Sequence, residues 1–138
     1  MNLPGLLAPI LALVLWTLVI WLWMYATRIP AMQKAKIDPQ AAARTRTLAL
    51  PAEIMWVSDN YNHLMEQPTI FYATAIAAQL AGQADGLNIA LAWTYVGLRV
   101  VHSLIQVTVN IVTLRFTMFT LSTVALAVLA LRTAAALW

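Results

Sequence analysis

Five strongly polar or ionisable side chains stand between Trp56 and Phe71, in the first half of a long, mainly apolar run. They are Asp59, Asn60, Asn62, His63 and Glu66. Ionisable groups at membrane depth are costly, and they usually face the interior of a helix bundle or a water-filled cavity. All of them except Asn60 follow the spacing of one helical face. We therefore interpret this face as a candidate functional site.

A second polar stripe lies further along the chain, again inside an apolar stretch. Its members follow three-and-four spacing, which places them on one face of a helix: Arg99, His102, Ser103, Gln106 and Asn110. Such a stripe is hard to expose to lipid. One interpretation is a seam of interhelical hydrogen bonds that holds the bundle together. The other is the second wall of a polar pocket.

Glu66 and Arg99 are expected to meet between the two stripes. At ~1.5 Å per residue they lie roughly 22 and 17 Å from the cytoplasmic ends of their helices. Neither charge is expected to stand alone in hydrocarbon, and losing one partner of a buried pair costs about 3–5 kcal/mol. We therefore predict a buried ion pair that is essential to folding.

His63 and His102 lie on different predicted helices, which also allows them to ligate a b-type haem. Their depths differ by about one turn, and no glycine groove accompanies them. Hydrogen-bonded histidines are therefore the preferred interpretation. The sequence shows no metal-ligand spacing, Gly-rich phosphate loop or Ser–His–Asp arrangement, so no metal site is expected.

The composition indicates a membrane protein. Of the 138 residues, 62% are hydrophobic and only 9% are charged, whereas soluble domains average about 25% charged residues. The net charge of +3 does not indicate nucleic-acid binding. The absence of cysteine excludes a disulfide, a thiolate nucleophile and a cysteine metal site.

Four apolar segments are long enough to cross the ~30 Å core of a bilayer. We expect an all-α membrane protein, an antiparallel bundle of four transmembrane helices, in a single domain over residues 1–138. Pro68 is expected to kink the second helix. The segment 28–50 is expected to be a polar loop, with a helical turn from Ala41 that runs into the second helix. The four helices are predicted over about residues 4–27, 51–81, 87–109 and 114–137.

Basic residues are concentrated in the first loop, which carries five of the eight in the chain: Arg28, Lys34, Lys36, Arg44 and Arg46. The turn over residues 82–86 has none. Cytoplasmic loops carry the excess of Lys and Arg, so loop 28–50 is expected in the cytoplasm and both termini outside.

Two motifs give the chain a family resemblance. They are Asn62-x-x-x-Glu66-x-Pro68-x-x-Phe71-Tyr72 and Ala92-Trp-x-Tyr-x-x-x-Arg99-x-x-His102-Ser103, followed by Arg115. With four spans, the chain resembles the MAPEG family (membrane-associated proteins in eicosanoid and glutathione metabolism), over about residues 9–131. It is most similar to a bacterial subgroup whose activity is not established, which implies the bacterial inner membrane.

The resemblance implies a homotrimer that binds glutathione between neighbouring subunits, near the cytoplasmic side. It implies a glutathione-dependent transferase or peroxidase acting on lipophilic electrophiles. Arg115 matches the arginine beside the thiol and is the catalytic candidate. The candidate residues for binding glutathione are Lys34, Lys36, Asn62, His63, Glu66, Arg99, His102 and Gln106. We expect a polar pocket open to the cytoplasmic half of the membrane, lined by these helix residues and Arg115.

Three positions depart from the family pattern. Asp59 stands where an arginine is expected, His63 where an asparagine is expected, and Gln106 where a tyrosine is expected. An alternative is therefore a non-enzymatic membrane protein or accessory subunit. Its polar cluster would be structural, or would bind a membrane lipid or a membrane-protein partner. Asp59 and Gln106 favour this alternative, whereas Arg115 and the lysines favour the enzyme.

Overall fold

Helices make up nearly all of the computed structural model, which describes residues 5–138. This described part of the chain contains no strand, and the all-α prediction is confirmed. The elements in chain order are α1 (Leu7–Lys34), α2 (Pro39–Thr45), α3 (Ala52–Leu64), α4 (Pro68–Leu80), α5 (Gly86–Thr108) and α6 (Val112–Leu137).

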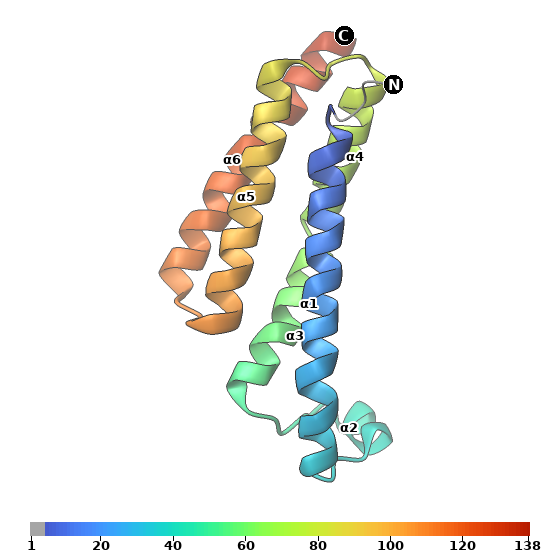
Figure 1. Cartoon of the computed structure of the whole chain (residues 1–138), viewed down its shortest axis with the longest axis vertical. Coiled ribbons are helices and arrows are strands. Elements are labelled where there is room, and N and C mark those ends of the chain that lie inside the picture. The colour runs from blue at the N-terminus through green and yellow to red at the C-terminus, as the bar shows by residue number, and fades with distance from the viewer. Residues whose placement is uncertain (1–4) are drawn as a thin grey trace.

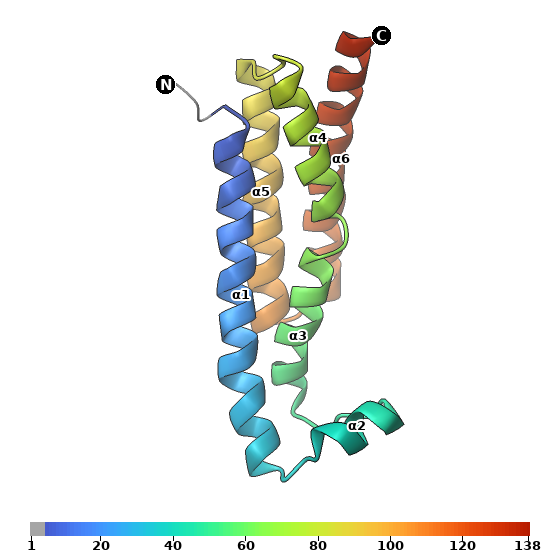
Figure 2. The ribbon, with the colours of Figure 1, turned by 90° about the vertical axis from the view of Figure 1, so that its right-hand side faces the viewer.

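The long helices lie side by side along one axis (Figures 1 and 2). α3 and α4 follow one another end to end and form one rod beside α1. α5 and α6 form an antiparallel hairpin, as predicted for these neighbouring segments. α1 begins and α6 ends at the same end of the bundle, and the short α2 lies across the opposite end.

The core lies where the rods meet. Leu13 and Ile20 of α1 are fully buried, as is Leu129 of α6. Phe71 of α4 stacks on Tyr95 of α5, with 4.4 Å between their ring centroids. These contacts join α4 to α5 at mid-height.

Apolar side chains also cover the outer faces of the bundle. They include Leu11, Leu15, Leu22 and Leu131, all exposed. α1 and α6 are each long and apolar enough to cross a membrane. α3 and α4 have 13 residues each, so each reaches only about 20 Å and neither is long enough alone.

The first loop is shorter than expected. α1 continues past Thr27 to Lys34 and contains Pro30, because the loss of one N–H does not end a helix whose following residues are good helix formers. The expected start at residue 4 lies outside the described residues. The helical turn from Ala41 belongs to α2 and does not run into α3. α2 is capped by the Asp38 carboxylate, which accepts the Gln40 N–H at 3.0 Å.

The second predicted helix is broken rather than kinked. Pro68 has no N–H to donate, so the helical ladder stops before it. α3 ends in tight turns in which the Met65 N–H donates to the Asn62 carbonyl at 3.0 Å and the Glu66 N–H to the His63 carbonyl at 3.3 Å. Pro68 is then the first residue of α4, a position that suits its fixed φ.

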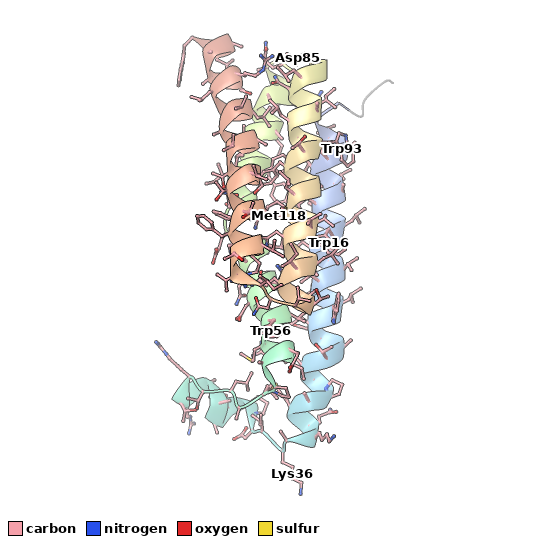
Figure 3. The ribbon with its side chains drawn as sticks, turned by 90° about the vertical axis from the view of Figure 1, so that its left-hand side faces the viewer. Trp16, Lys36, Trp56, Asp85, Trp93 and Met118 are labelled. Carbon is pink, nitrogen blue, oxygen red and sulfur yellow. The ribbon has the colours of Figure 1, made fainter. Side chains whose placement is uncertain are left out.

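A polar network closes the end of the bundle opposite α2 (Figure 3). The Asp85 carboxylate caps α5 by accepting the Asn88 N–H at 2.8 Å and pairs with Arg132 of α6 at 2.9 Å. Arg132 also donates to the buried Asn88 side chain at 2.8 Å. The Asn88 N–H, and then Arg132, lower the pKa of the Asp85 carboxyl. This network holds the start of α5 to the last third of α6.

Asp85→Ala should lower the temperature of thermal unfolding in detergent by a few degrees at neutral pH. Because the folded-state pKa of Asp85 is depressed, its contribution is present above the unfolded-state pKa and is lost as the pH falls through the folded-state value. The difference from wild type should therefore shrink in acid. Asp85→Asn, which keeps a capping oxygen, should lose less. An equal difference at both pH values would contradict this role.

Candidate functional site

A cavity of about 570 Å³ opens between α3, α5 and α6, in the half of the bundle nearer α2. This volume falls within the range of about 300–1,000 Å³ that is typical of small-ligand sites. Polar and apolar side chains line it together: Asp59, Asn62, His63, Glu66, His102, Gln106, Val112, Arg115, Phe116 and Phe119. The cavity thus brings together both polar stripes and the start of α6.

Two histidines form one wall of this cavity. The rings of His63 and His102 are stacked, with centroids 5.0 Å apart, and Phe119 lies 5.5 Å from His63. Haem ligation requires both ring nitrogens to point at one iron, whereas these rings meet face to face. The arrangement therefore does not fit the haem alternative. In the described residues, no three His, Asp or Glu side chains gather as metal ligands.

Glu66 does not form the predicted ion pair with Arg99. Its carboxylate lies 3.0 Å from His63 Nδ1, and its side chain is 67% exposed. The reason is the break before Pro68. The tight turn at the end of α3 rotates Glu66 away from the continuous helical face on which the sequence spacing had placed it. The prediction of a buried ion pair is wrong, although Glu66 does reach the cavity.

Arg99 lies behind the cavity and does not line it. It is fully buried, and its NH2 group donates to the His63 carbonyl at 3.4 Å. Its guanidinium also sits over Phe119, 5.4 Å from the ring centroid. The C-terminal end of a helix carries partial negative charge, so the end of α3 partly compensates this buried cation. Its Nε and NH1 have no partner among the described residues.

Gln106 takes part both in a hydrogen-bonded seam between helices and in the wall of the pocket. It reaches the cavity, and its side-chain oxygen also accepts a hydrogen bond from Asn60 at 2.8 Å. Asn60 is fully buried, so the bond joins α3 to α5 inside the bundle. Gln106 therefore belongs to a hydrogen-bonded seam between α3 and α5, and this seam borders the cavity.

Arg115 stands in the first turn of α6 at the mouth of the cavity. Its NH1 group donates to the Asn110 side chain at 2.7 Å. Asn110 adopts a left-handed backbone conformation (φ 50°) in the turn between α5 and α6, which asparagine tolerates better than most residues. The tight turn thus fixes a cation beside the two histidines.

Lys34 and Lys36 lie away from the cavity of their own chain. Both are exposed, at the end of α1 and just beyond it, and Figure 3 shows Lys36 at the extreme end of the molecule. The continuation of α1 past Pro30 carries them beyond the level of α3. Of the sequence candidates, the two lysines and Arg99 therefore do not line the cavity.

The sequence candidates omit the apolar wall. Val112, Phe116 and Phe119 of α6 line the cavity, and their spacing of four and then three residues is that of one helical face. Asp59 also lines it; it belongs to the predicted polar face but not to the candidate residues for binding glutathione. In an apolar helix the same spacing occurs on lipid-facing surfaces, so only the neighbouring Arg115 signals that this face meets a site.

Comparison with known proteins gives one match. The model of the MAPEG family matches residues 6–135, a range that contains every residue of the cavity. No curated protein and no solved structure matches the chain. The family match and the two long apolar helices fit an integral membrane protein.

Glu66→Gln should change the free energy of unfolding by less than about 1 kcal/mol, because exposed charge pairs contribute little. Arg99→Ala should lower it by about 2–5 kcal/mol, because truncation leaves a void in the core. Arg99→Met should restore most of this loss, since it refills the volume and removes a buried charge. Unfolding in detergent measures all three. Equal losses for Glu66→Gln and Arg99→Ala would instead indicate a Glu66–Arg99 pair.

Proposed function

The chain belongs to the MAPEG family, and on that premise we propose that it is a glutathione-dependent transferase acting on lipophilic electrophiles. One observation carries the proposal. A single cavity combines the guanidinium of Arg115, the carboxylate of Glu66 and an apolar wall formed by Phe116 and Phe119. A charged peptide and an apolar co-substrate can lie side by side in such a cavity.

The polar wall suits the groups of glutathione. The tripeptide carries one ammonium, two carboxylates and a thiol. Glu66 accepts hydrogen bonds from the ammonium, and the amides of Asn62 and Gln106 bind peptide groups. Arg115 provides the cation, either to a carboxylate or to the sulfur. The volume of about 570 Å³ leaves room for a second molecule.

The proposed chemistry rests on Arg115. A cation beside a thiol lowers its pKa, and the thiolate is the nucleophilic form. With an aryl halide, the thiolate sulfur attacks the ring carbon and a carbon–sulfur bond forms. The halide then leaves with its bonding electrons, and the thiol proton passes to water. The apolar wall binds the ring, which enters from the bilayer.

In the proposed membrane arrangement the chain spans the bilayer four times, through α1, the α3–α4 rod, α5 and α6. The apolar surfaces of α1 and α6 support it. Five basic residues in 28–50 support a cytoplasmic loop, with both termini outside the bacterial inner membrane. The cavity then opens toward the cytoplasm, which supplies glutathione.

A homotrimer is part of the same proposal. Asp59 and Asn62 on α3, and Glu66 in the turn after it, are exposed within the proposed span. Polar groups at that depth are costly against lipid. A neighbouring copy that covers this face would remove the cost and close the open side of the cavity.

The alternative is a non-enzymatic membrane protein whose polar cluster is structural or binds a lipid or a protein partner. The buried Asn60–Gln106 bond favours it, because these two polar residues already satisfy one another. Titration of the purified protein with glutathione separates the two functions. Saturable binding at millimolar concentration supports the enzyme, and no binding supports the alternative.

Arg115→Ala should lower turnover of an activated aryl chloride about tenfold or more at neutral pH, with a smaller effect on glutathione affinity, because a stabilised thiolate is lost. The deficit should shrink at alkaline pH, where the thiol ionises without help. Arg115→Lys is the matched control and should retain part of the activity. Turnover that is unchanged in Arg115→Ala would remove Arg115 from the mechanism.

Asp59→Asn should tighten glutathione binding by about two- to fivefold, because a carboxylate in the cavity repels an anionic peptide. The gain should diminish at high salt. Glu53→Gln makes the same change of charge in the first turn of α3, outside the cavity, and should leave the affinity unchanged. An equal gain in both variants would indicate a general effect of net charge.

A further inference from the structure

A second cavity, of about 330 Å³, lies between the last turns of α1, α2 and the residues that follow α2. It shares no residue with the first cavity. Its lining consists of Arg28, Met32, Pro39, Ala42, Ala43, Arg46, Thr47 and Leu48. The volume is near the lower limit of small-ligand sites, which suits a compact group rather than a long molecule.

Two arginines line this cavity, and the Arg28 side chain is held in place. NH1 of Arg28 donates to the Ser58 hydroxyl at 2.8 Å, and this bond leaves the other donors of Arg28 available. Arg46 ends α2 in a left-handed backbone conformation (φ 53°). Such a conformation is uncommon for arginine, and conformations of this kind often occur at ligand sites.

Neither arginine is neutralised within the structure. Among residues 5–138, the ion pairs involve other side chains, and neither Arg28 nor Arg46 pairs with a carboxylate. The surrounding segment 28–50 adds three more cations and a single acid, Asp38. The Asp38 carboxylate already accepts the Gln40 N–H. The cavity therefore lies in a positive field.

The rest of the lining is apolar. Met32, Ala42 and Leu48 are half-buried in its walls. α2 starts beside the last turns of α1 and projects sideways from the bundle (Figure 2). It lies just beyond the apolar stretch that contains Trp21, Trp23 and Tyr25. Tryptophan and tyrosine gather at membrane–water interfaces. An interface at this aromatic cluster would put Arg28 and Arg46 at headgroup level, next to an apolar surface.

We propose that this cavity binds the headgroup of an anionic phospholipid. Guanidinium groups bind phosphate oxygens in a bidentate manner, and basic pockets at the cytoplasmic ends of helices bind anionic headgroups. Arg28 and Arg46 bind the phosphate diester, and the acyl chains continue along the apolar surface of α1. The lipid joins α2 to α1 and fixes α2 at the membrane surface.

The test is native mass spectrometry of the purified protein released from nanodiscs of equimolar phosphatidylglycerol and phosphatidylcholine. Wild type should retain phosphatidylglycerol about tenfold over phosphatidylcholine. Arg46→Asn should reduce this preference about fivefold, a factor that corresponds to about 1 kcal/mol for one basic contact. Asparagine tolerates the left-handed conformation, so this variant keeps the turn.

Arg44→Gln is the matched control, because Arg44 lies in the last turn of α2 but does not line the cavity. The preference of this variant for phosphatidylglycerol over phosphatidylcholine should stay within about twofold of wild type. An equal loss in Arg44→Gln and Arg46→Asn would overturn the site in favour of diffuse charge attraction. An unchanged Arg46→Asn would also overturn it. Displacement of the lipid by millimolar inorganic phosphate would show a soluble phosphate site and overturn the lipid assignment.

Discussion

The His63 carbonyl at the broken end of α3 bonds a buried cation, Arg99, that lacks a carboxylate partner. Arg99 is fully buried and bonds the His63 carbonyl, so its desolvation is offset by backbone oxygen and by the ring of Phe119. That arrangement depends on Pro68, which ends the ladder and leaves α3 with a free end at mid-height. The position of α3, and therefore of the cavity wall, follows from this break.

Because Arg99 is bonded to backbone, Glu66 is available to the cavity. A Glu66–Arg99 pair would have drawn the carboxylate into the core and closed the space between α3 and α5. Instead Glu66 bonds His63, whose ring stacks on His102. The two helices are held together deeper in the bundle by Asn60 and Gln106. The polar residues therefore divide into a seam that stabilises the bundle and a set that faces open space.

The sequence predicts which residues share a helical face better than it predicts which side chains contact one another. Periodicity places His63 and Glu66 on one face, and His102 and Gln106 on another, and both faces meet at the cavity. The partner of Arg99 is not predictable in this way, because the turn before Pro68 rotates Glu66 by an amount that spacing does not encode. The position of Phe116 and Phe119 in the cavity is equally unpredictable from the sequence, since a lipid-facing helix has the same pattern. Lys34 and Lys36 lie away from the cavity because α1 continues through Pro30 and carries them beyond the level of α3.

The network of Asp85, Asn88 and Arg132 has a mechanical consequence for the opposite end of the molecule. It fastens α5 to α6 at one end, and the short turn that contains Asn110 fastens them at the other. Because α5 and α6 are connected at both ends, the hairpin is rigid and the two helices do not separate easily. The α3–α4 rod is interrupted in the middle, and it borders the cavity through α3 and through Glu66 in the turn after α3. A ligand that enters the open cavity therefore meets a rigid wall from α5 and α6, and we expect the wall formed by α3 to make most of any adjustment to its shape.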